Sequence, residues 1–496
     1  MRNKSILGPP RRSVLSVVLL AAALRLYHLG AESLWIDEGY SLRDAAGANS
    51  LRSIRPLYFY MLHWWMRLGD SESWLRLPSA IFGIGAVALL YLVGRRIYGH
   101  KVGLMASLIL AVSPLHVNHS QEIRMYSLAT LLVIAEVLFF IRYVEAGRTR
   151  DLIACLALAA AAFLAFPLTA FMLAVFNLFF LARVRRRAES IRWYASQCAI
   201  GLAAIPLVPA FVRVTRDYGE AWTWRMAKPG VPDIVRVMRD FNLWRIPPDH
   251  RLGALVGGAY AVFVLALAAY GVARAYKGVR WQTLLVALWL AVPLVGTAVA
   301  SNVLANMWLT RYMIYASPAY YLLTALGLSA IPGRRLFWMA LAAVLALPMV
   351  RLGSYYGKAH RPEWRQAVRY IERHLEEGDA IALYRYGNRY SFDYYYSGRA
   401  PRVALGQTRL TRSSFGGWSD RRIAGMMSAI PPGRRVWFVL SYHEDTGGFS
   451  IERYIRGHYR VLATRDFVRI RVYLAAPKGS RLPPGNSRAK GRVGRL

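Results

Sequence analysis

Long apolar segments recur along most of this 496-residue chain and limit its possible folds more than any other feature. A helix that crosses the hydrocarbon core of a bilayer needs about 20 predominantly apolar residues, at about 1.5 Å per residue. Eleven segments approach this length: 13–29, 75–93, 102–117, 125–141, 152–165, 167–182, 195–212, 252–273, 282–300, 312–331 and 336–352. The hydrophobic share of 56% also exceeds that of an ordinary soluble chain. The sequence predicts an α-helical polytopic membrane protein with about 11 transmembrane helices.

The basic residues are concentrated in alternate connections between these segments. The formal net charge is +37. The basic groups are Arg95, Arg96 and Lys101, then Arg142, Arg148 and Arg150, then Arg183, Arg185, Arg186, Arg187 and Arg192, then Arg274, Lys277 and Arg280, and finally Arg334 and Arg335. Cytoplasmic loops carry such an excess, so we expect a cytoplasmic N-terminus and an outer face at residues 113–124 and 301–311. The charge is therefore assigned to membrane orientation and not to nucleic-acid binding.

The composition becomes that of a soluble protein after Leu352. Pro362-Glu363-Trp364-Arg365 leads into an expected amphipathic helix that contains Val368, Ile371 and Leu375 and ends at Glu377-Gly378-Asp379. Strands are expected to follow at 380–384, 436–440 and 467–474. We therefore expect three regions: a transmembrane domain (1–354), a small extracytoplasmic α/β domain (355–477), and a basic, disordered tail (478–496).

Two adjacent carboxylates, Asp37 and Glu38, follow the first apolar segment, in a chain that has only 27 acidic residues against 64 basic ones. If this segment is extended, the two side chains point to opposite faces. Asp37 is then the candidate for proton transfer, and Glu38 is the one that orients a partner group or binds a substrate. The sequence leaves the reverse assignment open. The same connection also carries Arg55 and His63.

Two further outer connections are rich in polar side chains. The connection around 113–126 holds His116, His119, Glu122, Arg124 and Tyr126, and the later one ends at Arg311. A guanidinium at the outer end of a helix can bind a phosphate headgroup bidentately. It can equally snorkel toward ordinary lipid headgroups, and the histidines can simply cap helices. No fixed ligand spacing accompanies the histidines, so a divalent metal is left open.

Taken together, these connections resemble glycosyltransferase family 39, the family of dolichyl-phosphate-mannose protein mannosyltransferases and bacterial relatives. The resemblance rests on Leu34-Trp35-Ile36-Asp37-Glu38, Arg55-Pro56-Leu57-Tyr58, Trp74-Leu75-Arg76-Leu77-Pro78-Ser79, Gln121-Glu122-Ile123-Arg124-Met125-Tyr126, and Arg311-Tyr312 with Pro318. It covers residues 13–352, with a weaker match at Pro362-Glu363-Trp364-Arg365. It implies a GT-C fold, a polyprenyl-phosphate-linked sugar as donor, an inverting reaction and the Asp37-Glu38 pair as the catalytic centre.

This reaction gives each candidate residue an expected role. Transfer to a hydroxyl needs a carboxylate base, for which Asp37 is chosen, and the leaving phosphate needs positive charge. Arg311 and Arg124 are the leading phosphate ligands, with Arg76 as a weaker third. Glu122 is expected to pair with Arg124 or to bind the acceptor or a metal. The auxiliary candidates are His116, His119, His63 and Tyr126.

The expected function is thus an integral glycosyltransferase of the bacterial inner membrane, acting at the outer face on a lipid, glycan or protein acceptor. No cofactor is assigned, and a divalent metal is left open. The connection 213–251, with Trp222, Trp224 and Trp244, and the C-terminal domain are expected to select the acceptor. The alternatives are a flippase that moves a lipid-linked glycan without making a bond, and a structural subunit that binds glycans. Clear internal repeats would favour the flippase, but none is visible.

Overall fold

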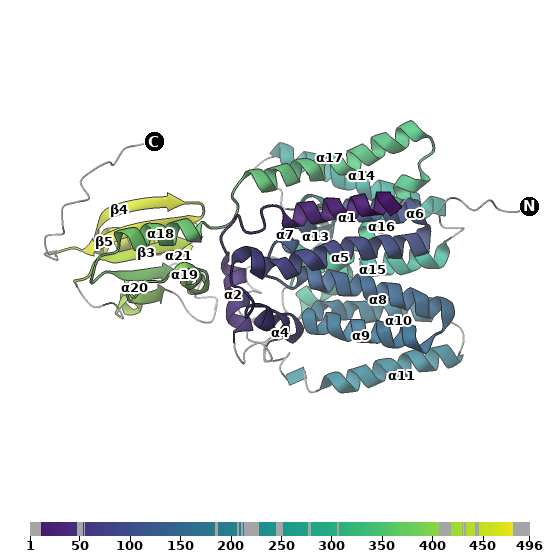
Figure 1. Cartoon of the computed structure of the whole chain (residues 1–496), viewed down its shortest axis with the longest axis horizontal. Coiled ribbons are helices and arrows are strands. Elements are labelled where there is room, and N and C mark those ends of the chain that lie inside the picture. Colours follow the sequence, from purple (N-terminus) through teal and green to yellow (C-terminus); the bar gives the residue numbers. More distant parts are fainter. Residues whose placement is uncertain are drawn as a thin grey trace, which may run out of the picture. The chain divides into compact units, whose positions relative to one another are not determined.

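The computed structural model describes two units (Figure 1). Described are residues 11–46, 53, 55–183, 187–205, 208–209, 212, 228–244, 251–275, 279–304, 307–405, 418–428, 430, 433–441 and 446–479. Met1–Ala31 and Ser41–Ala359 form the first unit, and Glu32–Tyr40 and His360–Leu496 form the second. The predicted boundary after residue 354 lies close to the start of the main block of the second unit. Trp222, Trp224 and most of the predicted tail lie outside the described residues.

The described first unit is built of helices, most of which lie side by side in Figure 1. They are α1 (Arg11–Leu26), α4 (Pro56–Trp65), α5 (Glu72–Tyr98), α6 (His100–Ala111), α7 (Pro114–Ser120), α8 (Tyr126–Ala146), α9 (Thr149–Ala165), η1 (Pro167–Ala170), α10 (Phe171–Arg183), α11 (Arg187–Ala204), α13 (Val231–Leu243), α14 (Arg251–Ala275), α15 (Arg280–Val303), η3 (Thr310–Ala316), α16 (Ser317–Ala330) and α17 (Arg334–Gly357). Helix α2 (Ile36–Ala45) begins in the second unit and ends in the first. Each of the eleven predicted apolar segments overlaps one of these helices.

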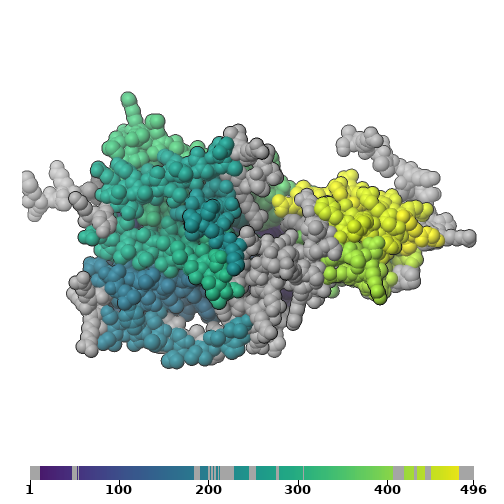
Figure 2. All heavy atoms as spheres, turned by 180° about the vertical axis from the view of Figure 1, so that it is seen from behind, coloured from purple at the N-terminus to yellow at the C-terminus, as the bar shows by residue number. Residues whose placement is uncertain are grey.

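Among the described residues, five helices are long and apolar enough to cross a membrane: α5, α8, α14, α15 and α17. The pair α6 and α7 passes the same test as one span that is bent by 61°. Exposed large apolar side chains line α14, α15 and α17, including Leu255, Val262, Val295, Val299, Trp338 and Met339. Figure 2 shows the face of the unit to which α14 and α15 (teal) contribute. The chain is therefore a multi-pass membrane protein, and eleven spans stay a prediction.

The bend between α6 and α7 is stabilised by a buried arginine. Pro114 begins α7 and has no backbone N–H to continue the α6 ladder, while the Ser113 side chain caps the new helix. The break leaves the last α6 carbonyls without helical donors. Arg25 of α1, which is fully buried, donates to the carbonyls of Ala111 (3.1 Å) and Leu110 (3.2 Å). These two hydrogen bonds and the Ser113 cap fix the start of α7, the helix that contains His116 and His119.

Helices α14 and α16 approach so closely that only glycine fits at their crossing. A methyl group on Gly327 of α16 would collide with the backbone carbonyl of Leu267 in α14, and one on Gly271 with the backbone of Gly327. Small residues let the backbones of membrane helices pack in this way.

Gly327→Ala should therefore destabilise the protein by about 2–3 kcal/mol, because the helices must separate to admit the methyl group. Thermal unfolding in detergent micelles measures the loss. Gly258→Ala, in α14 itself, is the matched control, since nothing lies within 4 Å of its added methyl group. The control should be neutral or stabilising by up to about 1 kcal/mol, from helix propensity. Equal melting temperatures for the two variants would contradict the packing argument.

The second unit contains a five-stranded sheet in the order β2-β1-β3-β5-β4. The strands are β1 (Ala380–Tyr384), β2 (Arg402–Leu405), β3 (Val436–Ser441), β4 (Tyr459–Phe467) and β5 (Ile470–Pro477). β1 pairs in parallel with β2 and β3, whereas β5 is antiparallel to β3 and β4. The helices are α18 (Trp364–His374), α19 (Asn388–Tyr395), α20 (Asp420–Met427) and α21 (Thr446–His458).

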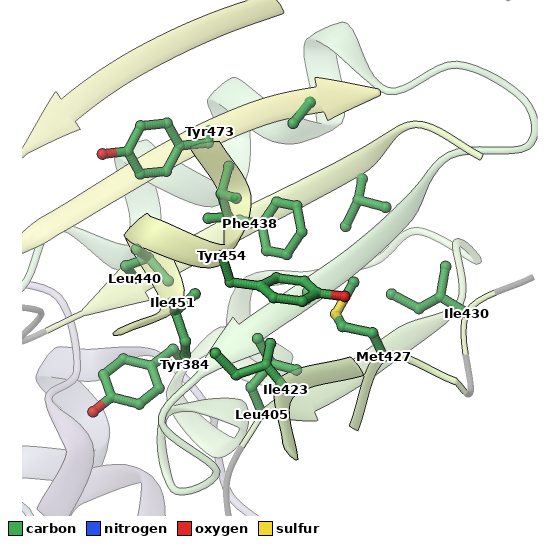
Figure 3. Packing of buried hydrophobic residues seen from close by; sticks show 14 of the residues in the cluster. Tyr384, Leu405, Ile423, Met427, Ile430, Phe438, Leu440, Ile451, Tyr454 and Tyr473 are labelled. Carbon is green, nitrogen blue, oxygen red and sulfur yellow. The ribbon is translucent and has the colours of Figure 1, made fainter. Parts of the chain in front are cut away.

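Alternate strand residues pack on opposite faces of this sheet, as the period of two requires. One core contains Tyr384, Phe438 and Tyr473 with residues of α20 and α21 (Figure 3). The other contains Leu383 and Trp437 with residues of α18 and α19. A chain that is mostly helical and carries a small sheet agrees with the predicted fold class, and the helix predicted at Trp364 is present.

The strand predicted at 467–474 is wrong in its boundaries. Phe467 ends β4 and pairs with Ile470, the first residue of β5, so residues 468–469 form a two-residue hairpin loop. Arg469 has φ of 57°, the positive value that tight hairpin turns need. Arginine is not a typical residue for this conformation, so the sequence gives no turn signal there.

Candidate active site

Asp37 and Glu38 lie in the first turn of α2, where negative charge stabilises the helix dipole. The expectation of an extended segment is therefore wrong. Successive residues of a helix are separated by about 100° around its axis, so the two carboxylates point in different directions without lying on opposite faces. The backbone N–H of Trp35, the residue before the helix, donates to Glu38 Oε2 (3.2 Å). The Glu38 side chain thus caps the N-terminus of its own helix.

The two carboxylates have different surroundings. Glu38 is fully buried, and its Oε2 also accepts a hydrogen bond from Arg361 Nη1 (3.2 Å) in the second unit. Asp37 is partly exposed. A buried carboxylate paired with arginine is held in one position, whereas a partly exposed one can meet a substrate.

A third acid, Glu32, lies shortly before α2 in the chain. Its Oε1 accepts the backbone N–H of His360 (2.7 Å), and its Oε2 lies 3.0 Å from His360 Nε2 and 3.5 Å from Arg361 Nε. Burial by itself raises the pKa of Glu32, but the His360 hydrogen bond and the charges of His360 and Arg361 outweigh it and leave the pKa below its usual value. Glu32 is thus held as a carboxylate beside Arg361.

In the first unit, Glu122 holds two side chains of α7. Its Oε1 accepts from Asn118 Nδ2 (2.9 Å), and its Oε2 lies 2.8 Å from His119 Nδ1. The His119 ring also makes edge contacts with Tyr126 (4.9 Å) and Trp244 (4.7 Å) between ring centroids. These contacts give Glu122 a role in fixing the His119 ring next to Tyr126. Of the three tryptophans expected to select an acceptor, Trp244 is the one within the described residues.

Glu122→Ala should destabilise the protein by about 2–4 kcal/mol, because the buried Asn118 amide and His119 imidazole lose an acceptor. Thermal unfolding in detergent checks this value. Glu145→Ala is the control: Glu145 pairs with Arg96 at a largely exposed position, and its loss should change stability by less than about 1 kcal/mol. A melting temperature unchanged in Glu122→Ala would show that other groups hold His119.

Tyr126 is the centre of an aromatic platform. Its ring centroid lies 5.7 Å from that of Phe166 and 6.4 Å from that of Tyr312, and these two lie 5.7 Å apart. The three rings come from the start of α8, the end of α9 and the η3 turn. Residues far apart in sequence thus form one surface inside the first unit.

Three arginines surround this platform, and we call Arg55, Arg124 and Arg311 the arginine cluster. All three interact electrostatically with Tyr126. Arg124 lies 5.7 Å from the Tyr126 ring, Arg55 lies 5.8 Å from Phe166, and Arg311 lies 5.8 Å from Tyr312. Three positive charges that all act on the Tyr126 phenol also repel one another, and a multiply charged anion relieves that repulsion. The cluster can therefore bind a phosphate.

Sequence reasoning chose Arg124 and Arg311 but missed Arg55 as a phosphate ligand. The sequence feature that could have indicated Arg55 is the proline that follows it. Pro56 begins α4, so Arg55 lies at the N-terminus of that helix. Arg124 Nη1 also donates to Ser41 Oγ (3.1 Å), which lies on α2 one turn after Asp37.

The remaining predicted residues lie elsewhere in the first unit. Arg76 is buried in α5 and donates from Nη1 to the Leu29 carbonyl (2.9 Å). His63 Nδ1 lies 2.8 Å from the Ala45 carbonyl oxygen, and His116 Nε2 lies 2.6 Å from Ser317 Oγ. These contacts connect segments of the fold, and the roles predicted for the three residues in the reaction stay predictions.

Within the described residues, no group of three or more His, Cys, Asp or Glu side chains could hold a metal ion. The carboxylates and imidazoles described above contact each other in pairs: Glu122 with His119, and Glu32 with His360. The question of a metal stays open.

Comparison with known proteins finds one matching family model and several solved structures of similar fold. Residues 53–210 match the family model described as dolichyl-phosphate-mannose-protein mannosyltransferase. The fold is similar to that of ArnT from Cupriavidus metallidurans bound to undecaprenyl phosphate, with 15% identity, a TM-score of 0.61, and coverage of 96% of this chain and all of that one. The structural comparison shows the fold, and the family-model match agrees, over residues 53–210, with the resemblance seen in the outer connections.

Two further solved structures share the fold. AglB from Archaeoglobus fulgidus, in complex with an inhibitory peptide and a dolichol-phosphate, is 11% identical with a TM-score of 0.56, over 96% of this chain and 75% of that one. The mycobacterial arabinofuranosyltransferase AftD is 14% identical with a TM-score of 0.53, over 94% of this chain and 40% of that one. No curated protein matches the sequence. Arg55 and Arg124 lie inside the matched family region, whereas Asp37, Glu38 and Arg311 lie outside it.

Proposed function

We propose that this chain is a GT-C glycosyltransferase that transfers a single sugar from a polyprenyl-phosphate carrier to an acceptor hydroxyl at the outer face of a bacterial inner membrane. The N-terminus is then cytoplasmic, and the second unit is extracytoplasmic. The observation that carries the proposal is the arginine cluster around Tyr126. Its positive charge matches the phosphate of such a donor, and Tyr312, whose ring is partly exposed beside the buried rings of Tyr126 and Phe166, can contact the sugar or the prenyl chain.

Two relatives of the same fold add support, because their structures contain lipid phosphates. ArnT was solved with undecaprenyl phosphate and AglB with a dolichol-phosphate. The AglB structure also holds an inhibitory peptide. For this chain the acceptor can be a lipid, a glycan or a protein, and the sugar is left open.

The bond changes of the proposed reaction are those of an inverting displacement. The acceptor oxygen forms a bond to the anomeric carbon while the bond from that carbon to the phosphate oxygen breaks. Asp37 takes the acceptor proton, and the electron pair of the broken bond leaves with the phosphate. The arginine cluster stabilises the negative charge that develops on the phosphate. The products are the glycosylated acceptor and the polyprenyl phosphate.

Asp37 is favoured over Glu38 as the base because of its surroundings. Glu38 is fully buried against Arg361, whereas Asp37 is partly exposed. Glu38 is thereby assigned to the support of α2, and Asp37 to proton transfer.

The test is to incubate the purified full chain in lipid with defined polyprenyl-phosphate sugars and candidate acceptors, and to measure release of free polyprenyl phosphate. Release that depends on the acceptor supports the transferase. A flippase instead moves a labelled donor across proteoliposomes and releases no lipid phosphate. A structural subunit gives neither signal, and either of these results would overturn the proposal.

A further inference from the structure

The acid segment, residues 32–40, packs as part of the second unit although it lies more than 300 residues earlier in the chain than the rest of that unit. Besides Glu32 and Glu38, four residues of the segment make hydrogen bonds or close contacts with the rest of the second unit. The Leu34 N–H donates to Tyr395 Oη (2.8 Å), and Ser33 Oγ accepts the Arg365 N–H (3.2 Å). Gly39 lies against Ser391, where no larger side chain fits, and Tyr40 packs on Tyr390 at 5.4 Å.

Arg361 links the two ends of this segment. Its Nη1 donates to Glu38 Oε2 (3.2 Å) at one end, and its Nε lies 3.5 Å from Glu32 Oε2 at the other. Arg361 itself is only 6% exposed, and Glu38 is fully buried. A guanidinium has donors in a rigid planar fork and can hold two carboxylates in a defined geometry, which a lysine ammonium cannot do.

Asp37 is the residue next to Glu38 and extends from the same helical turn. A carboxylate that acts as a base must be held within about 1 Å of its working position, since a larger displacement costs about 100-fold in rate. Asp37 is attached through Glu38 to a buried ion pair, which is a rigid support of the kind that such positioning needs.

We infer that Arg361 is a positioning residue for the transfer reaction: by holding Glu32 and Glu38 it fixes Asp37, so that the second unit is part of the catalytic apparatus and not only an acceptor-binding module. The inference rests on the proposed function. It assigns Glu38 to the anchor and leaves proton transfer to Asp37.

The experiment compares Arg361→Met, Arg361→Lys and Arg435→Met in the full chain, with kcat and donor KM measured well below each melting temperature. Arg361→Met should lower kcat about 10- to 100-fold with little change in donor KM, because the base is displaced while the donor site is untouched. Arg361→Lys should recover part of the rate, since the charge remains but the fork is lost. A fourth variant, Arg361→Ala, leaves space for a free guanidinium ion, and millimolar guanidinium should raise its kcat.

Arg435→Met is the matched control. Arg435 makes paired hydrogen bonds with Asp379 (2.8 Å each) in the same unit, far along the sequence from the acid segment. Its loss should lower the melting temperature and leave kcat within about twofold of the parent, because no catalytic group is attached to it.

The outcomes separate this inference from the proposed function. If the parent chain releases no lipid phosphate with any donor and acceptor, the proposed function fails. If the parent is active and Asp37→Asn is inactive, but Arg361→Met keeps the parent kcat, the positioning role alone is overturned. A fall in kcat of equal size in Arg361→Met and Arg435→Met also overturns it, because both effects then follow from lost stability.

Discussion

Asp37→Asn is expected to lower kcat for sugar transfer by at least about 1,000-fold while the protein stays folded and binds donor normally. Asparagine has nearly the shape of aspartate but cannot accept the acceptor proton at neutral pH. Because Asp37 is partly exposed in the first turn of α2, the loss of its charge should change stability by less than about 1 kcal/mol. Release of polyprenyl phosphate, binding of labelled donor and the melting temperature give the three readouts.

Asp44→Asn is the matched control for this change. Asp44 lies on the same helix and pairs with its neighbour Arg43 near the surface. Its substitution removes one negative charge from α2 without touching the first turn, so kcat should stay within about twofold of the parent. An active Asp37→Asn variant would remove Asp37 from the mechanism, and a further test of Glu38→Gln would then decide the reverse assignment.

The helices of the first unit could be predicted from the sequence because hydropathy is a local property. All eleven apolar segments overlap helices, and the segment 102–117 even contains the bend at Val112 and Ser113, next to the proline that causes it. Helix α18 was predictable for the same reason, since Trp364, Val368 and Ile371 repeat at helical spacing and are all buried.

Contacts between distant segments could not be predicted. Glu32–Tyr40 packs with residues from 360 onward, and Arg361 contacts two carboxylates of that segment. The sequence around Arg361 does not indicate that these carboxylates, some 320 residues earlier, are its partners. Arg55 was passed over for a related reason: its importance comes from Phe166 and Tyr126, which belong to other helices. A single sequence contains the residues of such a cluster but not their proximity.

The arginine cluster provides the second large effect. Arg311→Ala and Arg124→Ala are each expected to raise donor KM or lower kcat/KM about 10- to 150-fold, because a hydrogen bond to a charged group contributes about 1.5–3 kcal/mol. The acceptor KM should change little. Arg55→Ala should behave in the same way if all three guanidinium groups contact the phosphate. Arg55 is the sharpest of the three tests, because it was found only through its electrostatic interaction with Tyr126 and its place 5.8 Å from Phe166.

Two further variants, Arg311→Lys and Arg96→Ala, distinguish phosphate binding by the cluster from a structural role. Arg311→Lys keeps the charge and loses the bidentate fork, so it should fall between the parent and Arg311→Ala in kcat/KM for the donor. Arg96→Ala removes a guanidinium that pairs with Glu145 at an exposed position, and it should leave donor kinetics unchanged. If the three cluster variants lower the melting temperature but leave donor kinetics at the parent values, the arginines support the fold around Tyr126 and the phosphate binds elsewhere. If donor kinetics change at unaltered stability, the positive charge around Tyr126 is the donor site.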